Sequence, residues 1–213
     1  MPVDPVRDAA VDVLLRVSER HMQLDAALDR SLRRRENLSP RGRRFLSQLV
    51  YGSVRHWRLL DYAVQPLLRQ PLGEMPPAMR WVLRLGMFQS LFCDQVTHPA
   101  MVHTSVDLAR KRGHAGLAKL ANAVLRRAPK RLEDVALPPE SDLPQWLAVR
   151  YSLPDWLVAL WLAQFGDEAA ALCAACNRPA PVSIRVNTLR TTPDGLSPRL
   201  EKAGFAAVSA TPV

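Results

Sequence analysis

Apolar side chains recur at intervals of three and four positions through most of the first 125 residues, a period typical of α-helices with one buried face. The first series follows Asp4-Pro5 and the helix from residue 40 follows Ser39-Pro40, and each pair supplies an N-cap and a first-turn proline. Further helices are predicted at about 24–35, 40–58, 59–68, 76–93, 98–112, 117–125, 143–150, 154–165 and 167–176. The segment 76–93 is apolar on most sides and is expected at the centre of the core. The chain is therefore predicted to be mainly all-α.

The period changes after residue 181. From 182 to 187, apolar residues at even positions alternate with polar residues at odd positions, which is a strand pattern. A helix is predicted at 193–203 and a second strand at 205–209. Two strands and one helix cannot form a sheet with a covered face. These residues are therefore predicted to be the start of a small α/β subdomain of the RNA-recognition-motif type, cut inside a larger unit.

The segment Leu137-Pro138-Pro139-Glu140-Ser141 has the composition of a linker. The charge balance changes nearby, because residues 1–134 hold 23 Lys+Arg against 13 Asp+Glu, whereas residues 135–213 hold 6 against 7. We therefore predict a helical domain at 1–134 and, at 135–213, linker helices followed by the incomplete α/β subdomain.

The formal charge of the chain is +9, and the whole excess lies in the first domain. A GC-rich genome explains why 25 of the 29 cations are arginines, but codon bias does not create a net charge. A surplus of this size indicates an acidic partner, and nucleic acid is the partner we expect.

The cations of the helical domain gather at helix ends and on one helix face. The helix at 40–58 has an apolar side and an opposite basic side, which is either a binding stripe or a solvated arginine face. The stripe adjoins the arginines that end the preceding helix, which favours binding. The candidate RNA-binding residues of this domain are Arg33, Arg34, Arg35, Arg41, Arg44, Arg126, Arg127, Lys130 and Arg131.

Two further candidates lie on the predicted strand. Arg185 and Asn187 share one face at a period of two, about 7 Å apart. A guanidinium and an amide so placed can contact a phosphate and a base edge together. The alternative is an exposed polar face on a half-buried sheet.

Other classes of site lack their motifs. No two glycines are spaced G-x-G, and neither a G-x-S-x-G elbow nor an H-E-x-x-H helix is present. Cys173 and Cys176 have no second ligand pair for zinc, and three cysteines do not suit a disulfide framework. We expect no catalytic, cofactor-binding or metal-binding residue in this chain. No apolar run approaches the roughly 20 residues of a membrane span, and no signal peptide is recognisable, so a cytoplasmic location without membrane contact is expected.

Five blocks of residues resemble a known family. Those that resemble the NusB-like all-α domain are Arg7-x-x-Ala10-x-x-Val13-Leu14-x-x-Val17, Arg43-Arg44-Phe45-Leu46-x-x-Leu49-Val50-Tyr51-Gly52-x-Val54-Arg55 and Leu120-Ala121-Asn122-Ala123-Val124-Leu125-Arg126. Two further blocks are Tyr151-x-x-Pro154-x-Trp156-Leu157 and the run from Asn177 to Asn187. They resemble the region that follows the NusB-like domain in bacterial 16S rRNA cytosine-C5 methyltransferases of the small subunit methyltransferase B type. The order of the blocks makes the resemblance specific, and it covers essentially the whole chain.

The resemblance implies a NusB-like helical bundle that binds 16S rRNA. It also implies S-adenosylmethionine as the cofactor of the full-length enzyme, whose catalytic domain lies further toward the C-terminus and uses a glycine-containing loop and two cysteines. None of those motifs occurs here, so no cofactor is expected in this chain and the chain alone is predicted to be inactive. The alternative is a free-standing NusB-like adaptor that binds RNA and a protein partner in transcription antitermination; residues 140–213 count against it. A protein partner of the helical domain is compatible with either interpretation.

Overall fold

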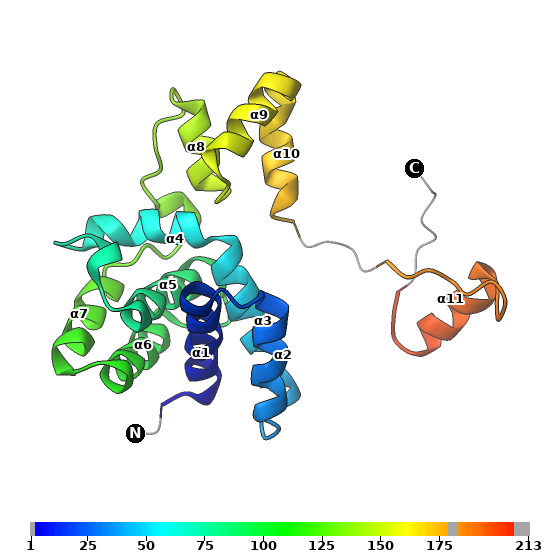
Figure 1. The fold of residues 1–213 in the computed structure, drawn as a ribbon, viewed down its shortest axis with the longest axis horizontal. Coiled ribbons are helices and arrows are strands. Elements are labelled where there is room, and N and C mark those ends of the chain that lie inside the picture. Colours follow the sequence, from blue (N-terminus) through cyan, green and yellow to red (C-terminus); the bar gives the residue numbers. More distant parts are fainter. Residues whose placement is uncertain (1–2, 179–182, 207–213) are drawn as a thin grey trace. The chain divides into compact units, whose positions relative to one another are not determined.

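The computed structural model describes residues 3–178 and 183–206 (Figure 1). The chain divides into two compact units, Met1–Asn177 and Arg178–Val213. Helices dominate the first unit, the described part of the second holds one helix, and the described ranges contain no strand. The prediction of a mainly all-α fold is confirmed. The predicted domain boundary after residue 134 stays a prediction, although the first unit continues to Asn177.

Seven helices build the bundle of the first unit. Asp4 accepts a hydrogen bond from the Arg7 amide at 2.8 Å, and Ser39 accepts one from the Gly42 amide at 3.1 Å, so the predicted caps begin their helices. The helices are α1 (Pro5–Arg20), α2 (Leu24–Arg34), α3 (Pro40–Arg55), α4 (Trp57–Val64), α5 (Pro77–Phe92), α6 (His98–Arg112) and α7 (Ala115–Leu125).

Helix α5 lies at the centre of the bundle, as its apolar sequence predicted (Figure 1). It packs against α1, α3, α4, α6 and α7. Two glycines permit the closest approaches. A Cβ atom at Gly52 of α3 would lie 2.0 Å from the Phe88 ring, and one at Gly86 of α5 would lie 2.6 Å from Leu125. The absence of these two side chains lets α3 and α7 pack directly on α5.

Three shorter helices follow the bundle within the first unit: α8 (Leu143–Arg150), α9 (Asp155–Phe165) and α10 (Ala169–Cys176). They share a small core of their own, centred on Leu147, Ala148, Val158 and Cys173. Helix α8 also contacts α4 of the bundle. This second core is therefore attached to the bundle through α4.

The expectation that no apolar run has the length of a membrane span is wrong for one stretch. Asp155–Cys176 has 22 residues, and an 18-residue window within it has a mean hydropathy of 1.3, which suffices by length and composition alone. The stretch is interrupted in its middle, because Gly166 takes a φ of +52° and a 3₁₀ turn, Gly166–Glu168, precedes α10. Helix α10 then packs against α9, so the stretch forms two short packed helices.

The second unit contains α11 (Pro193–Lys202), which Thr192 caps by accepting a hydrogen bond from the Gly195 amide at 3.2 Å. The strand predicted at 182–187 is not observed over its described residues, 183–187, which have no regular secondary structure. Position 182, like 207–209 of the second predicted strand, lies outside the described residues. An alternating pattern does not make a strand by itself, because a strand also needs a partner for its backbone groups.

Candidate nucleic-acid interface

The three arginines around the end of α2 have different surroundings. Arg33 is exposed and forms an ion pair with Asp29 at 2.8 Å. Arg34 is exposed. Arg35 instead forms an ion pair with Asp12 of α1 at 2.6 Å, and both side chains are only 24% exposed. Arg35 therefore holds α1 and α2 together, whereas Arg33 and Arg34 face solvent.

The basic side of α3 is open to solvent at its first turns. Arg41 and Arg44 are exposed, and within the described part of the chain their guanidinium groups make no ion pair or hydrogen bond. Arg43, between them, donates to the backbone oxygen of Leu32 at 3.2 Å and so joins α3 to α2. Adjacent arginines thus differ in role, with Arg43 engaged in packing and Arg41 and Arg44 available to a ligand.

The segment after α7 presents a second group of cations. Ser90 of α5 donates a hydrogen bond to the backbone oxygen of Pro129 at 2.7 Å, which holds this segment against the bundle. Arg131 forms an ion pair with Asp134 at 3.4 Å, and both side chains are largely exposed. The other exposed cations of the segment are Arg126, Arg127 and Lys130.

In the second unit, Arg185 and Asn187 are both exposed. They do not share the face of a strand, since 183–187 form none. The side-chain oxygen of Asn187 accepts a hydrogen bond from the Leu189 amide at 3.1 Å, which fixes the turn that follows. Asn187 therefore has a local structural role, while the Arg185 guanidinium extends from an irregular segment.

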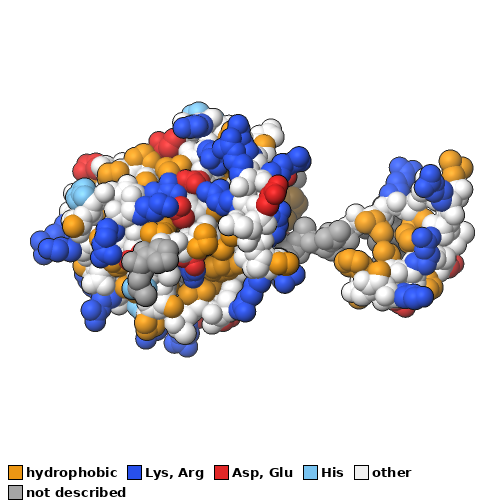
Figure 2. Space-filling view, turned by 90° about the horizontal axis from the view of Figure 1, so that it is seen from below, with side chains coloured by type: hydrophobic (Ala, Val, Ile, Leu, Met, Phe, Trp, Pro, Cys, Tyr) orange, Lys and Arg blue, Asp and Glu red, His pale blue; other side chains and the backbone are white. Residues whose placement is uncertain are grey.

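Most carboxylates of the bundle are engaged by other cations. Asp8 pairs with Lys111 at 2.6 Å, and Asp12 pairs with Arg112 at 2.7 Å as well as with Arg35. Burial raises the pKa of Asp12, but the hydrogen bonds from Arg112 and Arg35 outweigh this effect and hold the pKa below its ordinary value. Asp12 therefore stays ionised, and the two carboxylates neutralise Arg35, Lys111 and Arg112, whereas Arg41 and Arg44 have no ion-pair partner among the described residues. Figure 2 shows arginine and lysine side chains spread over the visible face of the larger unit, with few acidic ones among them.

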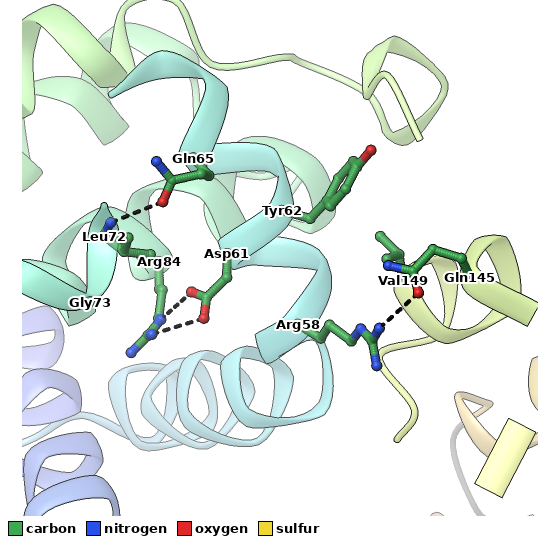
Figure 3. Close-up of a pocket in the computed structure, with 9 residues that line it drawn as sticks. All are labelled: Arg58, Asp61, Tyr62, Gln65, Leu72, Gly73, Arg84, Gln145 and Val149. Carbon is green, nitrogen blue, oxygen red and sulfur yellow. Dashed lines mark hydrogen bonds and ion pairs between the residues drawn. The ribbon is translucent and has the colours of Figure 1, made fainter. Parts of the chain in front are cut away.

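A hollow of about 380 Å³ lies between α4, α5, α8 and the 3₁₀ turn at Leu72–Glu74 (Figure 3). Its polar groups are already paired with one another. The hydrogen-bonded pairs are Arg84 with Asp61 at 2.9 Å, Arg58 with Gln145 at 3.3 Å, and the Leu72 amide with Gln65 at 2.9 Å. The residues that line the hollow therefore form a joint between the bundle and α8, and few of their polar groups are left for a ligand.

Sequence reasoning missed the two arginines that organise this joint. The guanidinium carbon of Arg84 lies 4.7 Å from the ring centre of Trp57 and 4.6 Å from that of Trp81, a double cation–π contact. Arg58 contacts Gln145 across 87 positions of sequence. No local pattern marks a contact over such a distance.

The described residues do not fit a methyl donor. Such donors bind at the carboxyl edge of a parallel sheet, beside a glycine-rich turn. The described ranges contain no sheet, and the sequence has no G-x-G pair. Among the same residues, no three His, Cys, Asp or Glu side chains are placed to hold a metal ion.

Among curated proteins, the chain is similar to the probable ribosomal RNA small subunit methyltransferase B of Synechocystis, with 38% identity over 87% of this chain and 42% of the relative. It is also similar to the ribosomal RNA small subunit methyltransferase B of Thermus thermophilus, with 42% identity over 84% of this chain and 40% of the relative. The chain thus spans about two fifths of the length of these relatives.

Two solved structures share the fold. The crystal structure of PH0851 superposes with a TM-score of 0.66 at 20% identity, over all of this chain and 48% of that one. The antitermination factor NusB, solved with NusE and double-stranded RNA, superposes with a TM-score of 0.53 at 23% identity, over 57% of this chain and 91% of that one. At these identities the likeness concerns the fold alone.

Family profiles match the same two parts of the chain as the blocks on which the resemblance rests. The NusB family profile matches residues 4–130, and the profile of the ferredoxin-like domain of RsmF/B-like methyltransferases matches residues 153–213. The resemblance stated from the sequence is confirmed. The chain therefore belongs to the NusB family through its helical bundle, and residues 153–213 are similar to the ferredoxin-like domain of RsmF/B-like methyltransferases.

Proposed function

We propose that this chain is the RNA-binding N-terminal part of an S-adenosylmethionine-dependent 16S rRNA cytosine-C5 methyltransferase, and that it positions the rRNA for a catalytic domain outside the matched region. The observation that carries the proposal is the set of exposed cations on the bundle, of which Arg41 and Arg44 make no ion pair within the described residues. The methyltransferase names of the relatives support the reaction class. A cytoplasmic location follows from the proposed ribosomal substrate.

The chemistry of the exposed cations suits a phosphate backbone. A guanidinium presents a planar fork of donors to phosphate oxygens, and each phosphate contact releases counterions, so affinity falls with salt. The same chemistry applies to the other exposed candidates of the bundle, and Arg185 and Asn187 add contacts from the second unit; the candidates of the bundle are Arg33, Arg34, Arg126, Arg127, Lys130 and Arg131. Arg35 contributes mainly by positioning α2, because its guanidinium is held by Asp12.

The proposal is tested by the salt dependence of binding between this chain and 16S rRNA fragments. The double variant Arg41→Gln/Arg44→Gln is expected to lower affinity and to reduce the slope of log K against log salt by about 1.4, the value for two single-strand phosphate contacts. Arg110→Gln/Lys119→Gln is the matched control, because it removes the same charge from exposed positions on α6 and α7. Equal losses of affinity in both double variants would show that Arg41 and Arg44 contribute only net charge.

The methyl donor is assigned to the full-length enzyme and not to this chain. We expect no binding of S-adenosylmethionine and no methylation of RNA by residues 1–213 alone, because the glycine loop and the catalytic cysteine motifs are absent from the sequence. Isothermal calorimetry with the donor checks this expectation. Micromolar binding would contradict it.

A free-standing antitermination adaptor is the second candidate function, and its support is the shared fold with NusB. Residues 153–213 oppose it, since they match a domain of methyltransferases. Preferential binding of this chain to 16S rRNA over an antitermination RNA of equal length separates the two candidates. The opposite preference, together with binding to a NusE-type protein, would favour the adaptor.

A further inference from the structure

Helix α9 has apolar residues on all its sides, yet most of its surface is uncovered. A helix of this kind is expected in the interior of a protein. Only Val158 is buried, on the side of α9 that faces the small core. On the outer side, Trp156 is 68% exposed and Leu160 51%. Trp156 and Leu160 are four positions apart and so lie on the same face. We call Trp156 and Leu160 the outer face of α9.

The segment that carries this face differs in charge from the rest of the chain, although Arg58 of α4 pairs with Asp155 at the start of α9. Residues 151–177 contain no lysine and no arginine, although the chain has 29. The charged residues of this range are Asp155, Asp167 and Glu168, all acidic. Aromatic platforms for single-stranded RNA lie in positively charged grooves, and helices that lie on membranes carry basic polar faces. The outer face of α9 fits neither partner and instead fits an apolar protein surface.

We propose that the outer face of α9 is the docking surface for the methyltransferase domain that the relatives carry beyond the matched region. This inference rests on the proposed function. Its first support is length, since the chain covers only 42% and 40% of the two relatives, which leaves them ample further polypeptide. Its second support is continuity, since the ferredoxin-like profile begins at residue 153 and so groups α9 with the residues that lead toward the C-terminus. The docked domain covers Trp156 and Leu160, and the helical bundle keeps its cations for RNA.

The test measures how accessible the Trp156 indole is in two proteins. One is this chain, and the other is this chain extended by the codons that follow Val213 in its gene. The emission of Trp156 is obtained by subtracting the spectrum of the Trp156→Phe variant of each protein. Acrylamide is expected to quench this emission strongly in the 213-residue chain and several-fold less in the extended protein, with a shift of the emission to shorter wavelength.

Two matched variants of the extended protein show whether docking causes the protection. Leu160→Glu is expected to restore quenching to the level of the 213-residue chain, because a carboxylate is costly to bury in an apolar contact. Ala123→Glu adds the same charge at an exposed position of α7 and is expected to leave the protection unchanged. In the 213-residue chain, Leu160→Glu is expected to leave rRNA affinity unchanged.

The docking proposal is overturned if Trp156 is not protected in the extended protein, or if another partner protects it. Equal quenching in the two proteins, or a reading frame that stops at Val213, leaves the face without the proposed occupant. If quenching in the 213-residue chain weakens as the protein concentration rises, a second copy of the chain covers the face. If quenching weakens when rRNA is added, RNA bases stack on the face. Protection of Trp156 in an extended protein that does not methylate 16S rRNA would reject the proposed function and keep the docking surface.

Discussion

The guanidinium of Arg58 on α4 lies 2.6 Å from the carboxylate of Asp155 at the start of α9, across 97 positions of sequence. The same guanidinium donates to the backbone oxygen of Leu153 at 3.0 Å and to Gln145 at 3.3 Å. Arg58 belongs to the residues matched by the NusB family, and Asp155 belongs to those matched by the ferredoxin-like domain. One side chain thus connects the parts of the chain that the two families describe.

Replacement of Arg58 by Met is expected to lower the free energy of unfolding by about 1–2 kcal/mol, because Leu153 and Gln145 lose their donor. Asp155→Asn serves as the control and is expected to cost about 0.5 kcal/mol or less, since the Asp155 side chain is 71% exposed and its ion pair is screened by water. Urea denaturation measures both. The hydrogen bond from Arg58 also lowers the pKa of Asp155, so an NMR titration of Arg58→Met should show that pKa rising.

Stability is expected to depend on pH through His56. Its ring stacks on Phe92 at 4.2 Å between centres, and burial, assisted by Arg55 and Arg150, lowers the pKa of His56 from 6.5 to about 4. The unfolded chain therefore binds more protons than the folded protein between these values. The free energy of unfolding should fall as the pH drops from 6.5 toward 4, by up to about 3 kcal/mol.

The variant His56→Phe isolates this effect, because it preserves the aromatic stack and removes the titrating group. Urea denaturation of both proteins from pH 7 to pH 4 is the measurement, and the carboxylates contribute alike to each. The fall in unfolding free energy should be smaller in the variant. Parallel curves for the two proteins would show that His56 does not couple folding to pH.

Gly52 is so closely packed that even the smallest side chain at this position is expected to lower the free energy of unfolding. Gly52→Ala places a Cβ atom 2.0 Å from the ring of Phe88, which is only 3% exposed. The expected loss is about 1–3 kcal/mol of unfolding free energy, because a well-packed core must shift to make room. Gly73→Ala is the control, since nothing lies within 4 Å of that Cβ position. A thermal denaturation in which both variants matched the parent protein would contradict the packing argument.

Arg185 is expected to contact rRNA from the second unit. In the protein extended beyond Val213, Arg185→Ala should weaken rRNA binding and reduce its salt slope by about 1, while leaving methyl-donor affinity unchanged. Arg190→Ala removes an exposed cation of the same unit and serves as the control. Filter binding and calorimetry measure the two affinities. If Arg185→Ala instead unfolded the unit without a separate effect on RNA, Arg185 would be structural.

The helical bundle could be predicted because its signals are local. The caps Asp4-Pro5 and Ser39-Pro40 act on amides three positions away, and the apolar period recurs within each turn. The alternating pattern at 182–187 misled for the opposite reason, since a strand depends on a partner that sequence period does not supply. Asn187 shows the difference, because its side chain accepts a hydrogen bond from Leu189, only two positions away.

The sequence by itself determined that this chain forms helices, that α5 is central, and that the positive charge belongs to the bundle. It could not determine which arginines remain free for a ligand. Arg35 and Arg41 are both polar-face arginines by pattern, yet Arg35 pairs with Asp12 and Arg41 faces solvent. Helical period fixes the direction of a side chain on its own helix, but only the packing of α1 against α2 brings the Asp12 carboxylate to Arg35. Tertiary structure therefore decided which charges hold the fold together and which remain on its surface.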